Sequence, residues 1–161
     1  MKHKELPSIE ILNERLIYDA SEGKLINKIT RCKAKAGEEA GSYDGKGYKQ
    51  VVIMRSKYLV HRIIWKMHTG TDPGNLIVDH KDRNPDNNHI SNLRLLTKSE
   101  NQENTIGRGI VKLTDKRKKA WQAAIRVNGV QQRTQHECPL MARLWYLDKK
   151  AELHPCFTQS A

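Results

Sequence analysis

The sequence predicts an α+β protein, and three observations support this fold class. Short runs of β-branched and aromatic residues alternate with turn-forming segments, which is typical of β-hairpins. Stretches with helical apolar spacing lie at the start, in the middle and near the end of the chain. Between residues 76 and 104, a strand, a polar loop, a second strand and a helix follow one another, which predicts a compact ββα unit.

The N-terminal segment predicts a helix followed by a hairpin. Apolar residues on one helical face indicate a helix over 8–16, and Ser8 is a plausible N-cap. Strands are expected at 16–19 and 24–27, with Gly23 supplying a positive-φ position in the turn between them. The Gly- and charge-rich stretch 33–47 is expected to be loop.

Two further strands and a helix are predicted before the ββα unit. The strands span 48–54 and 58–60, around Arg55-Ser56-Lys57. A short helix over 61–68 should follow, because it contains several apolar residues and Gly70 can end it.

The ββα unit is the most informative stretch of the chain. Residues 76–78 predict a short buried strand that ends at Asp79-His80, and the loop 81–88 contains no apolar residue. A second strand is expected at 93–96. Thr97 and Glu100 then form a capping-box pattern that opens a helix through about Asn104.

The chain changes character from about residue 108 onward. Three strands are expected at 110–113, 120–128 and 130–134, and Asn128-Gly129 is a strong hairpin signal between the last two. Pro139 opens a predicted helix over 140–153. We expect this helix to bury one apolar face, formed by Leu140, Leu144, Leu147 and Ala151.

The charge balance favours a polyanionic partner, most often nucleic acid. The 161 residues include 29 Lys and Arg against 18 Asp and Glu, a formal net charge of +11. No stretch approaches the roughly 20 apolar residues of a membrane helix, so we do not expect a membrane protein. No apolar segment follows the charged N-terminus, so we do not expect a secreted protein. Three separated cysteines without a Cys-x-x-Cys pair favour reduced thiols in a cytoplasm.

Asp79, His80, Asn92 and Asn101 form a candidate catalytic constellation. Asp79 and Asn101 offer two oxygen ligands, which suit a hard divalent cation such as Mg2+. His80 should point to the opposite side of the strand, where it could activate a water for in-line phosphodiester hydrolysis. Asn92 could hydrogen-bond the loop backbone and orient His80.

These residues also have ordinary structural interpretations. A histidine in a polar loop is more often solvated than catalytic, and an aspartate at a strand end is often a turn or cap residue. Asn88 and Asn92 would then only stabilise the turn. His61, Trp65 and His68 are expected to pack within or cap the helix over 61–68 rather than to act in catalysis.

Residues 79–88, 91–94 and 99–104 resemble the motif of HNH endonucleases. Eleven residues separate His80 from Asn92 and eight separate Asn92 from Asn101, as in the phage homing-type branch that has His-Asn-Asn in place of His-Asn-His. Residues 59–65 resemble the stretch that precedes the motif in these phage enzymes. The resemblance covers about residues 16–104 and implies a ββα-metal nuclease core.

The resemblance also implies a role for each residue of the constellation. His80 corresponds to the general base, Asp79 to the first metal ligand, Asn101 to the second ligand and Asn92 to the loop-orienting residue. An asparagine ligand favours Mg2+ or Mn2+ over Zn2+. Asn104 lies one helical step beyond Asn101 and stays an alternative ligand.

Basic residues provide candidate contacts to DNA. Arg62 and Arg94 could clamp a phosphate, with a surface salt bridge as the alternative for each. In the C-terminal sheet, Trp121 and every second residue after it in the strand should face the helix. Arg126 and Arg133 should face outward. Such a face could read bases in a groove, or could simply be solvated. The full candidate set is Arg62, Arg94, Lys112, Lys116, Arg117, Lys118, Lys119, Trp121, Arg126 and Arg133.

Residues 120–129 resemble the core of the ethylene-response-factor type of DNA-binding domain, which has three strands and a helix. This resemblance implies that residues 106–161 form a DNA-binding domain that positions the target. Residues 1–105 would then form the HNH nuclease domain with a β-rich N-terminal extension.

The sequence therefore predicts a Mg2+- or Mn2+-dependent endonuclease that cuts double-stranded DNA in a homing-like manner, phage-encoded and active in the host cytoplasm. The alternative is a sequence-specific DNA-binding protein with an inactive HNH-like unit, but both Asp79 and His80 are present. RNA binding is less favoured because the few aromatic residues form no evident stacking platform. The target site, the number of strands cut and the oligomeric state, a homodimer included, stay open.

Overall fold

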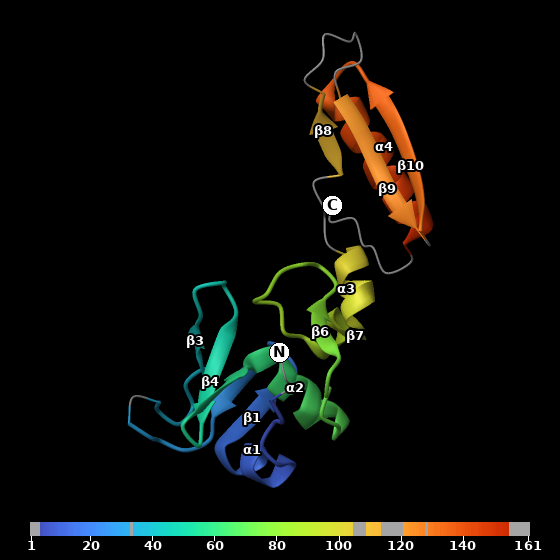
Figure 1. The fold of residues 1–161 in the computed structure, drawn as a ribbon. Coiled ribbons are helices and arrows are strands. Elements are labelled where there is room, and N and C mark those ends of the chain that lie inside the picture. Colours follow the sequence, from blue (N-terminus) through green and yellow to red (C-terminus); the bar gives the residue numbers. More distant parts are fainter. Residues whose placement is uncertain (1–3, 33, 105–108, 114–120, 128, 155–161) are drawn as a thin grey trace. The chain divides into compact units, whose positions relative to one another are not determined.

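A computed structural model describes residues 4–32, 34–104, 109–113, 121–127 and 129–154. Small antiparallel sheets and short helices make up these residues, so the predicted α+β class is confirmed (Figure 1). The chain divides into two compact units, Met1–Lys98 and Ser99–Ala161. This division falls at the start of α3 (Lys98–Asn104), whereas the sequence analysis placed a boundary between functional domains after that helix.

The first unit begins with a helix and a hairpin, as predicted. Helix α1 (Ile9–Arg15) leads directly into β1 (Leu16–Asp19), which pairs antiparallel with β2 (Lys24–Asn27). Gly23 in the connecting turn has a φ of 65°, in the left-handed region that glycine adopts without strain. The Ser8 side chain makes no hydrogen bond to the backbone of α1, although Ser8 occupies the N-cap position.

A three-stranded sheet and a longer helix follow. Strand β4 (Lys49–Ile53) lies between β3 (Ser42–Tyr43) and β5 (Ser56–Leu59), and β3 is a short strand within the stretch that was predicted to be loop. The hairpin turn consists of Met54 and Arg55, because Ile53 pairs with Ser56. The predicted turn, Arg55-Ser56-Lys57, therefore began one residue too late and was one residue too long.

Helix α2 (Val60–Thr69) forms the centre of the first unit's core. It ends at Gly70, whose φ of 75° confirms the predicted glycine C-cap. The largest fully buried side chains of the described residues come from α1, β2, β4 and α2. They are Leu12, Leu25, Ile53, Ile63 and Ile64. Apolar residues of β6 and β7 also belong to this core, which anchors the strands that carry Asp79 and His80.

The predicted strand–loop–strand segment forms a two-stranded antiparallel sheet. Strand β6 (Ile77–His80) pairs with β7 (Leu93–Leu96), and the helix α3 follows at the predicted position. A short 3-10 helix, η1 (Ile90–Asn92), precedes β7 and was not predicted. Tyr18 on β1 accepts a hydrogen bond from the Ile90 backbone at 3.1 Å, which ties the N-terminal hairpin to this segment.

The second unit contains a three-stranded antiparallel sheet with β9 (Trp121–Val127) between β8 (Ile110–Lys112) and β10 (Val130–His136). Helix α4 (Pro139–Leu153) packs against this sheet, and the Cys138 sulfur at its N-cap accepts a hydrogen bond from Met141. Val127 pairs with Val130, so a two-residue hairpin joins β9 and β10 as predicted. Asn128 in that turn lies outside the described residues.

The predicted buried face of α4 was wrong except for Leu147, which is partly buried against the core of this unit. Ala142, Tyr146 and Lys150 are its buried residues, whereas Leu140 and Leu144 are exposed. Four-residue steps place Ala142, Tyr146 and Lys150 on one helical face, and that face packs on Ala123 and Ile125 of β9. The Tyr146 ring covers Gly109, where any side chain would collide with it, so an aromatic residue rather than a leucine fills this space.

Two further expectations concern cysteines and membrane spans. Cys32 and Cys138 are free and exposed, while Cys156 lies outside the described residues. Within the part of the chain that the structure covers, no helix combines the length and the apolar character needed to cross a membrane.

Candidate active site

Asp79 and His80 lie at the end of β6 and point to opposite faces of the strand. Burial alternates along this strand, with Val78 and His80 buried and Asp79 only partly buried. His80 is 4% exposed and continues the core face of β6, whereas Asp79 lies on the other face. The alternation expected from the sequence is present in the structure.

Asp79 is paired with Arg94, which lies directly opposite it on β7. The Arg94 Nε donates to Asp79 Oδ2 at 2.9 Å, and both side chains are largely buried. Arg94 Nη2 is buried without a hydrogen-bond partner among the described residues. A buried guanidinium nitrogen without an acceptor has a desolvation cost that a phosphate oxygen could offset.

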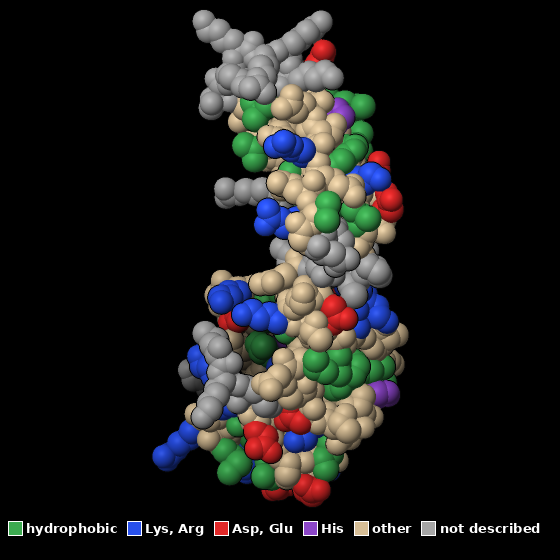
Figure 2. Space-filling model, turned by 45° about the vertical axis from the view of Figure 1, so that its right-hand side comes forward, with side chains coloured by type: hydrophobic (Ala, Val, Ile, Leu, Met, Phe, Trp, Pro, Cys, Tyr) green, Lys and Arg blue, Asp and Glu red, His purple; other side chains and the backbone are tan. Residues whose placement is uncertain are grey.

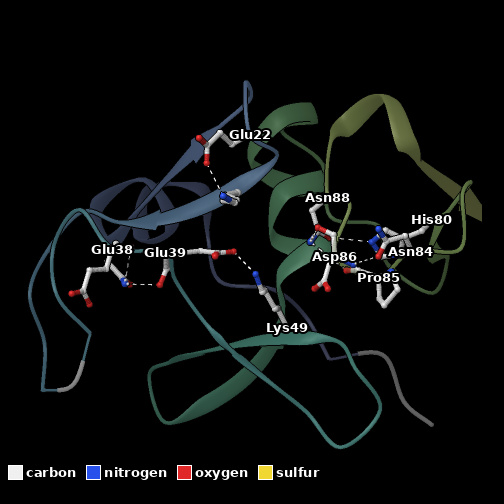
Figure 3. A network of polar contacts seen from close by, with 11 residues as sticks. Glu22, Glu38, Glu39, Lys49, His80, Asn84, Pro85, Asp86 and Asn88 are labelled. Atoms are coloured by element: carbon white, nitrogen blue, oxygen red, sulfur yellow. Dashed lines mark hydrogen bonds and ion pairs between the residues drawn. The ribbon is translucent and has the colours of Figure 1, made fainter.

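The His80 ring is anchored by Asn88 in the loop after β6. His80 Nε2 and Asn88 Oδ1 lie 3.0 Å apart, and Figure 3 shows the two side chains directed toward each other. Asn88 is only 3% exposed, although it belongs to a loop that contains no apolar residue. The one available signal was the position of an asparagine at the loop's end, close to a candidate base.

Asn92 closes the same loop through its side chain. The amide Nδ2 of Asn92 donates to Asp82 Oδ1 at 2.9 Å and to the Asn87 carbonyl at 2.8 Å. Asn92 Oδ1 accepts from the Asp82 backbone at 3.2 Å. These bonds join the first and last parts of the loop that carries Asn88, which is the kind of contact that the loop-orienting role of Asn92 requires.

Asp82 at the start of the loop is held as a carboxylate by this network. Burial acts to raise its pKa, but hydrogen bonds from the Asn84 backbone, Asn92 and Asn87 together place the pKa below its ordinary value. An ionised Asp82 accepts these bonds more strongly than a protonated one. The loop geometry is therefore stabilised at neutral pH.

His61 is a neighbour of His80 that the sequence analysis assigned only to helix packing. It is 5% exposed on α2, and its ring centroid lies 5.1 Å from that of His80 in an edge-to-face arrangement. The Tyr48 ring lies 5.5 Å from His61 and 6.4 Å from His80. Burial, with further contributions from His80 and Arg62, lowers the pKa of His61 to about 3, so its imidazole is neutral at physiological pH.

The donor types of the predicted metal site fit a hard divalent cation. Asp79 supplies a carboxylate, and Asn101 and Asn104 on α3 each supply an amide oxygen. Asn104 is the more buried of the two asparagines. Among the described residues there is no group of three or more His, Cys, Asp or Glu side chains able to hold a metal. The assignment of Asp79 and Asn101 stays a prediction.

Arg62 has a structural role that its predicted phosphate contact did not anticipate. Its guanidinium donates to the backbone carbonyls of Leu76 and Gly74, each at 2.8 Å, and lies 3.9 Å from Asp72. These contacts fasten α2 to the turn before β6. Because the guanidinium is used in this way, we leave Arg62 out of the DNA-binding set proposed below.

The two faces of the C-terminal sheet carry different candidate residues, as the alternation along the strand predicted. Trp121 is partly buried against the core of Ala123, Ile125, Ala142 and Tyr146, with the Lys112 ammonium 5.9 Å from its ring. Trp121 therefore packs on the core of this unit, and its predicted contact with DNA stays a prediction.

Arg126 and Arg133 lie on the other face of the sheet and are exposed. Lys116, Arg117, Lys118 and Lys119 lie outside the described residues. On the visible surface, Lys and Arg side chains form several separate groups, with Asp and Glu between some of them (Figure 2).

The central segment of the chain is similar to known proteins. Residues 58–103 match a family model described as HNH endonuclease, and this range contains α2, β6, the loop and β7. Over 89 residues, the chain is 30% identical to the SPbeta prophage-derived protein YosQ of Bacillus subtilis (strain 168), whose name assigns it as a candidate HNH homing endonuclease. The match includes 55% of this chain and 51% of YosQ, so the chain spans about half the length of that relative.

A solved structure described as "DNA binding and cleavage by the HNH homing endonuclease I-HmuI" is similar at 24% identity and a TM-score of 0.45, covering 83% of this chain and 79% of that one. The matched family range coincides with the segment that places His80, Asn88, Asn92 and Arg94 around the end of β6. Residues 58–103, which contain these side chains, are thus similar to HNH endonucleases.

Proposed function

We propose that this chain is a divalent-metal-dependent endonuclease that hydrolyses phosphodiester bonds in double-stranded DNA, with homing-like nicking or double-strand cleavage. One observation carries the proposal. A buried, hydrogen-bonded histidine directly follows a carboxylate on the opposite face of β6, within the segment that matches the HNH family. In the proposed mechanism, these adjacent residues with different exposures are the base and a cation ligand.

In this proposal, His80 accepts a proton from the water that attacks phosphorus. Histidine is a common general base at neutral pH, and the bond to Asn88 holds the ring in place. Asp79 and Asn101 would hold Mg2+ or Mn2+, which supplies positive charge next to the reacting phosphate. Arg94 would offer its unpartnered Nη2 to a phosphate oxygen, and Asn92 would keep the loop closed.

The second unit would position the DNA, in line with its resemblance to the ethylene-response-factor type of domain. After α3, this unit contains the strands β8, β9 and β10 and then the helix α4, and this order supports the proposal. The exposed Arg126 and Arg133 would contact DNA from the outer face of the sheet, with Lys112 at its edge. Lys116, Arg117, Lys118 and Lys119 would add phosphate contacts.

A supercoiled-plasmid assay tests the proposed activity. Wild type is compared with His80→Ala and with His68→Ala, which changes an exposed histidine at the end of α2. Each protein is incubated with EDTA, Mg2+, Mn2+ or Zn2+. We expect wild type and His68→Ala to convert the plasmid with Mg2+ or Mn2+, and His80→Ala to bind DNA without cleaving it, because phosphate contacts dominate affinity.

The products distinguish the forms of the activity. Open-circle DNA indicates nicking, and linear DNA indicates paired cuts. DNA of the source genome is included so that a missing target site does not hide the activity. Binding without cleavage on both substrates would contradict the proposal and favour a DNA-binding protein with an inactive HNH unit.

A further inference from the structure

The Asn88 side chain has a defined amide orientation, and this orientation carries information about His80. Asn88 Nδ2 lies 3.4 Å from the Pro85 carbonyl and 3.3 Å from the Asp86 carbonyl, and donates to both. Rotating the amide by half a turn would direct Oδ1 at these two carbonyl oxygens. It would also exchange the two carbonyl acceptors of the amide nitrogen for a single one, His80 Nε2, in a site that is only 3% exposed. Oδ1 therefore faces His80.

An amide oxygen can only accept a hydrogen bond, so the ring nitrogen facing it must carry the proton. His80 Nε2 lies 3.0 Å from Asn88 Oδ1, within the normal range for such a bond. A neutral imidazole has one protonated and one basic nitrogen, and the Asn88 bond determines which is which. The basic lone pair is then on Nδ1.

We propose that Asn88 is the positioning residue that holds neutral His80 as the Nε2–H tautomer, which leaves Nδ1 as the atom that accepts the proton from water. The inference rests on the proposed nuclease function and names the atom and the supporting side chain of the same site. The Nε2 bond also keeps an acceptor beside the imidazolium that forms when Nδ1 takes up the proton. Asn88 acts through His80 and does not touch the reacting atoms.

The surroundings of His80 keep the ring from exchanging its two nitrogens by rotation. His61 packs edge-on against the ring at a centroid distance of 5.1 Å and an interplanar angle of 76°. Tyr48 lies 6.4 Å away, at an interplanar angle of 33°. With His80 only 4% exposed, a ring flip would have to displace these neighbours and would move Nε2 away from Asn88.

Long-range 1H–15N NMR of 15N-histidine-labelled, metal-free protein tests the tautomer directly. The His80 signals are identified by their loss in His80→Gln. We expect protonated Nε2 and unprotonated Nδ1 in wild type, and a mixture of tautomers in Asn88→Ala. Protonated Nδ1 with unprotonated Nε2 in wild type, or an unchanged tautomer in Asn88→Ala, would overturn the proposal. The wild-type spectrum answers the question even if a variant folds poorly.

Single-turnover cleavage supplies the second measurement. Loss of a residue that orients a reactive side chain typically reduces activity about 10–100-fold, and we expect this reduction in Asn88→Ala with an unchanged Kd for DNA. Asn84→Ala is the matched control. Asn84 is an exposed asparagine of the same loop, and its Oδ1 accepts from the Asp86 backbone at 3.1 Å. An equal loss in Asn84→Ala would assign the effect to the loop as a whole and would contradict the role of Asn88.

The two measurements separate this inference from the proposed function. A wild-type protein that cleaves no DNA but shows the Nε2–H tautomer, lost in Asn88→Ala, would contradict the nuclease function while supporting the positioning by Asn88. Cleavage that depends on His80, together with the Nδ1–H tautomer, would support the function and contradict the inference.

Discussion

The buried imidazole of His61 couples the stability of the first unit to pH. Its pKa is lowered from 6.5 to about 3, so the unfolded chain binds a proton between these values that the folded chain does not. The stabilisation is fully present above about pH 6.5 and decreases as the pH falls toward 3. At pH 5, the loss from this residue should be about 2 kcal/mol.

Urea unfolding at pH 7 and pH 5 measures this effect when wild type is compared with His61→Phe. Phenylalanine keeps an aromatic ring on α2 without a titratable group, so the pH dependence of this variant reports all the other titratable groups. We expect the free energy of unfolding to decrease more in wild type than in His61→Phe. Equal decreases would show that His61 does not remain neutral in the folded protein.

The turn of the β4–β5 hairpin contains stored backbone strain. Met54 and Arg55 have φ values of 50° and 61°, which are costly for residues with a side chain. Because Ile53 pairs with Ser56, this is a two-residue turn, for which Asn-Gly is the favoured sequence. Met54→Asn with Arg55→Gly should raise the free energy of unfolding by about 1 kcal/mol.

Chemical denaturation of the double variant, with Lys57→Gly as the control, checks the turn. Lys57 lies within β5, where glycine should cost roughly 0.5–1 kcal/mol. If the double variant lost stability as Lys57→Gly does, replacing the two residues with positive φ would not stabilise the turn.

Gly23 is required both by its backbone and by its neighbour. A Cβ at this position would lie 2.7 Å from the His89 backbone nitrogen and 2.9 Å from two atoms of its ring. Gly23→Ala should therefore destabilise the protein by about 1–3 kcal/mol and reduce cleavage by shifting the loop that carries Asn88. Gly47→Ala is the control, because Gly47 also has a positive φ but has open space around it. Thermal unfolding and plasmid cleavage compare the two, and similar losses would contradict the contact with His89.

Elements that depend on local sequence were predictable, whereas contacts between elements were not. Apolar periodicity and turn residues located the β1–β2 hairpin, α2 with its Gly70 cap, and the β6–β7 pair. The burial of Asn88 depends on the site that closes around His80, and apolar periodicity does not report such a contact.

The α4 face illustrates the same limit. Leu140 and Leu144 were the expected core by hydrophobicity, but the sheet offers a space over Gly109 that suits the Tyr146 ring. Hydrophobic spacing predicted a helix without predicting which side meets the sheet. For the site, the adjacent Asp79 and His80 were visible in the sequence, while their partners Arg94 and Asn88 are defined by strand pairing and loop closure.

The net charge of +11 predicts how the whole chain should respond to salt. If DNA binding releases counterions, the logarithm of the binding constant falls linearly with the logarithm of the salt concentration, with a slope of about −0.9 per phosphate contact. The proposed role of the outer sheet face assigns part of that slope to Arg126 and Arg133, which are exposed on neighbouring strands.

Replacing both arginines, Arg126→Gln with Arg133→Gln, should therefore reduce the magnitude of the slope by up to about 1.8 if each contacts one phosphate. Fluorescence anisotropy with a labelled duplex across a salt series measures this slope. Lys24→Gln is the control, because Lys24 is paired with Glu22 on the exposed β1–β2 hairpin and should leave the slope unchanged. An unchanged slope in the double variant would exclude this sheet face from phosphate contact. The DNA-binding surface would then have to lie on other basic residues of the chain.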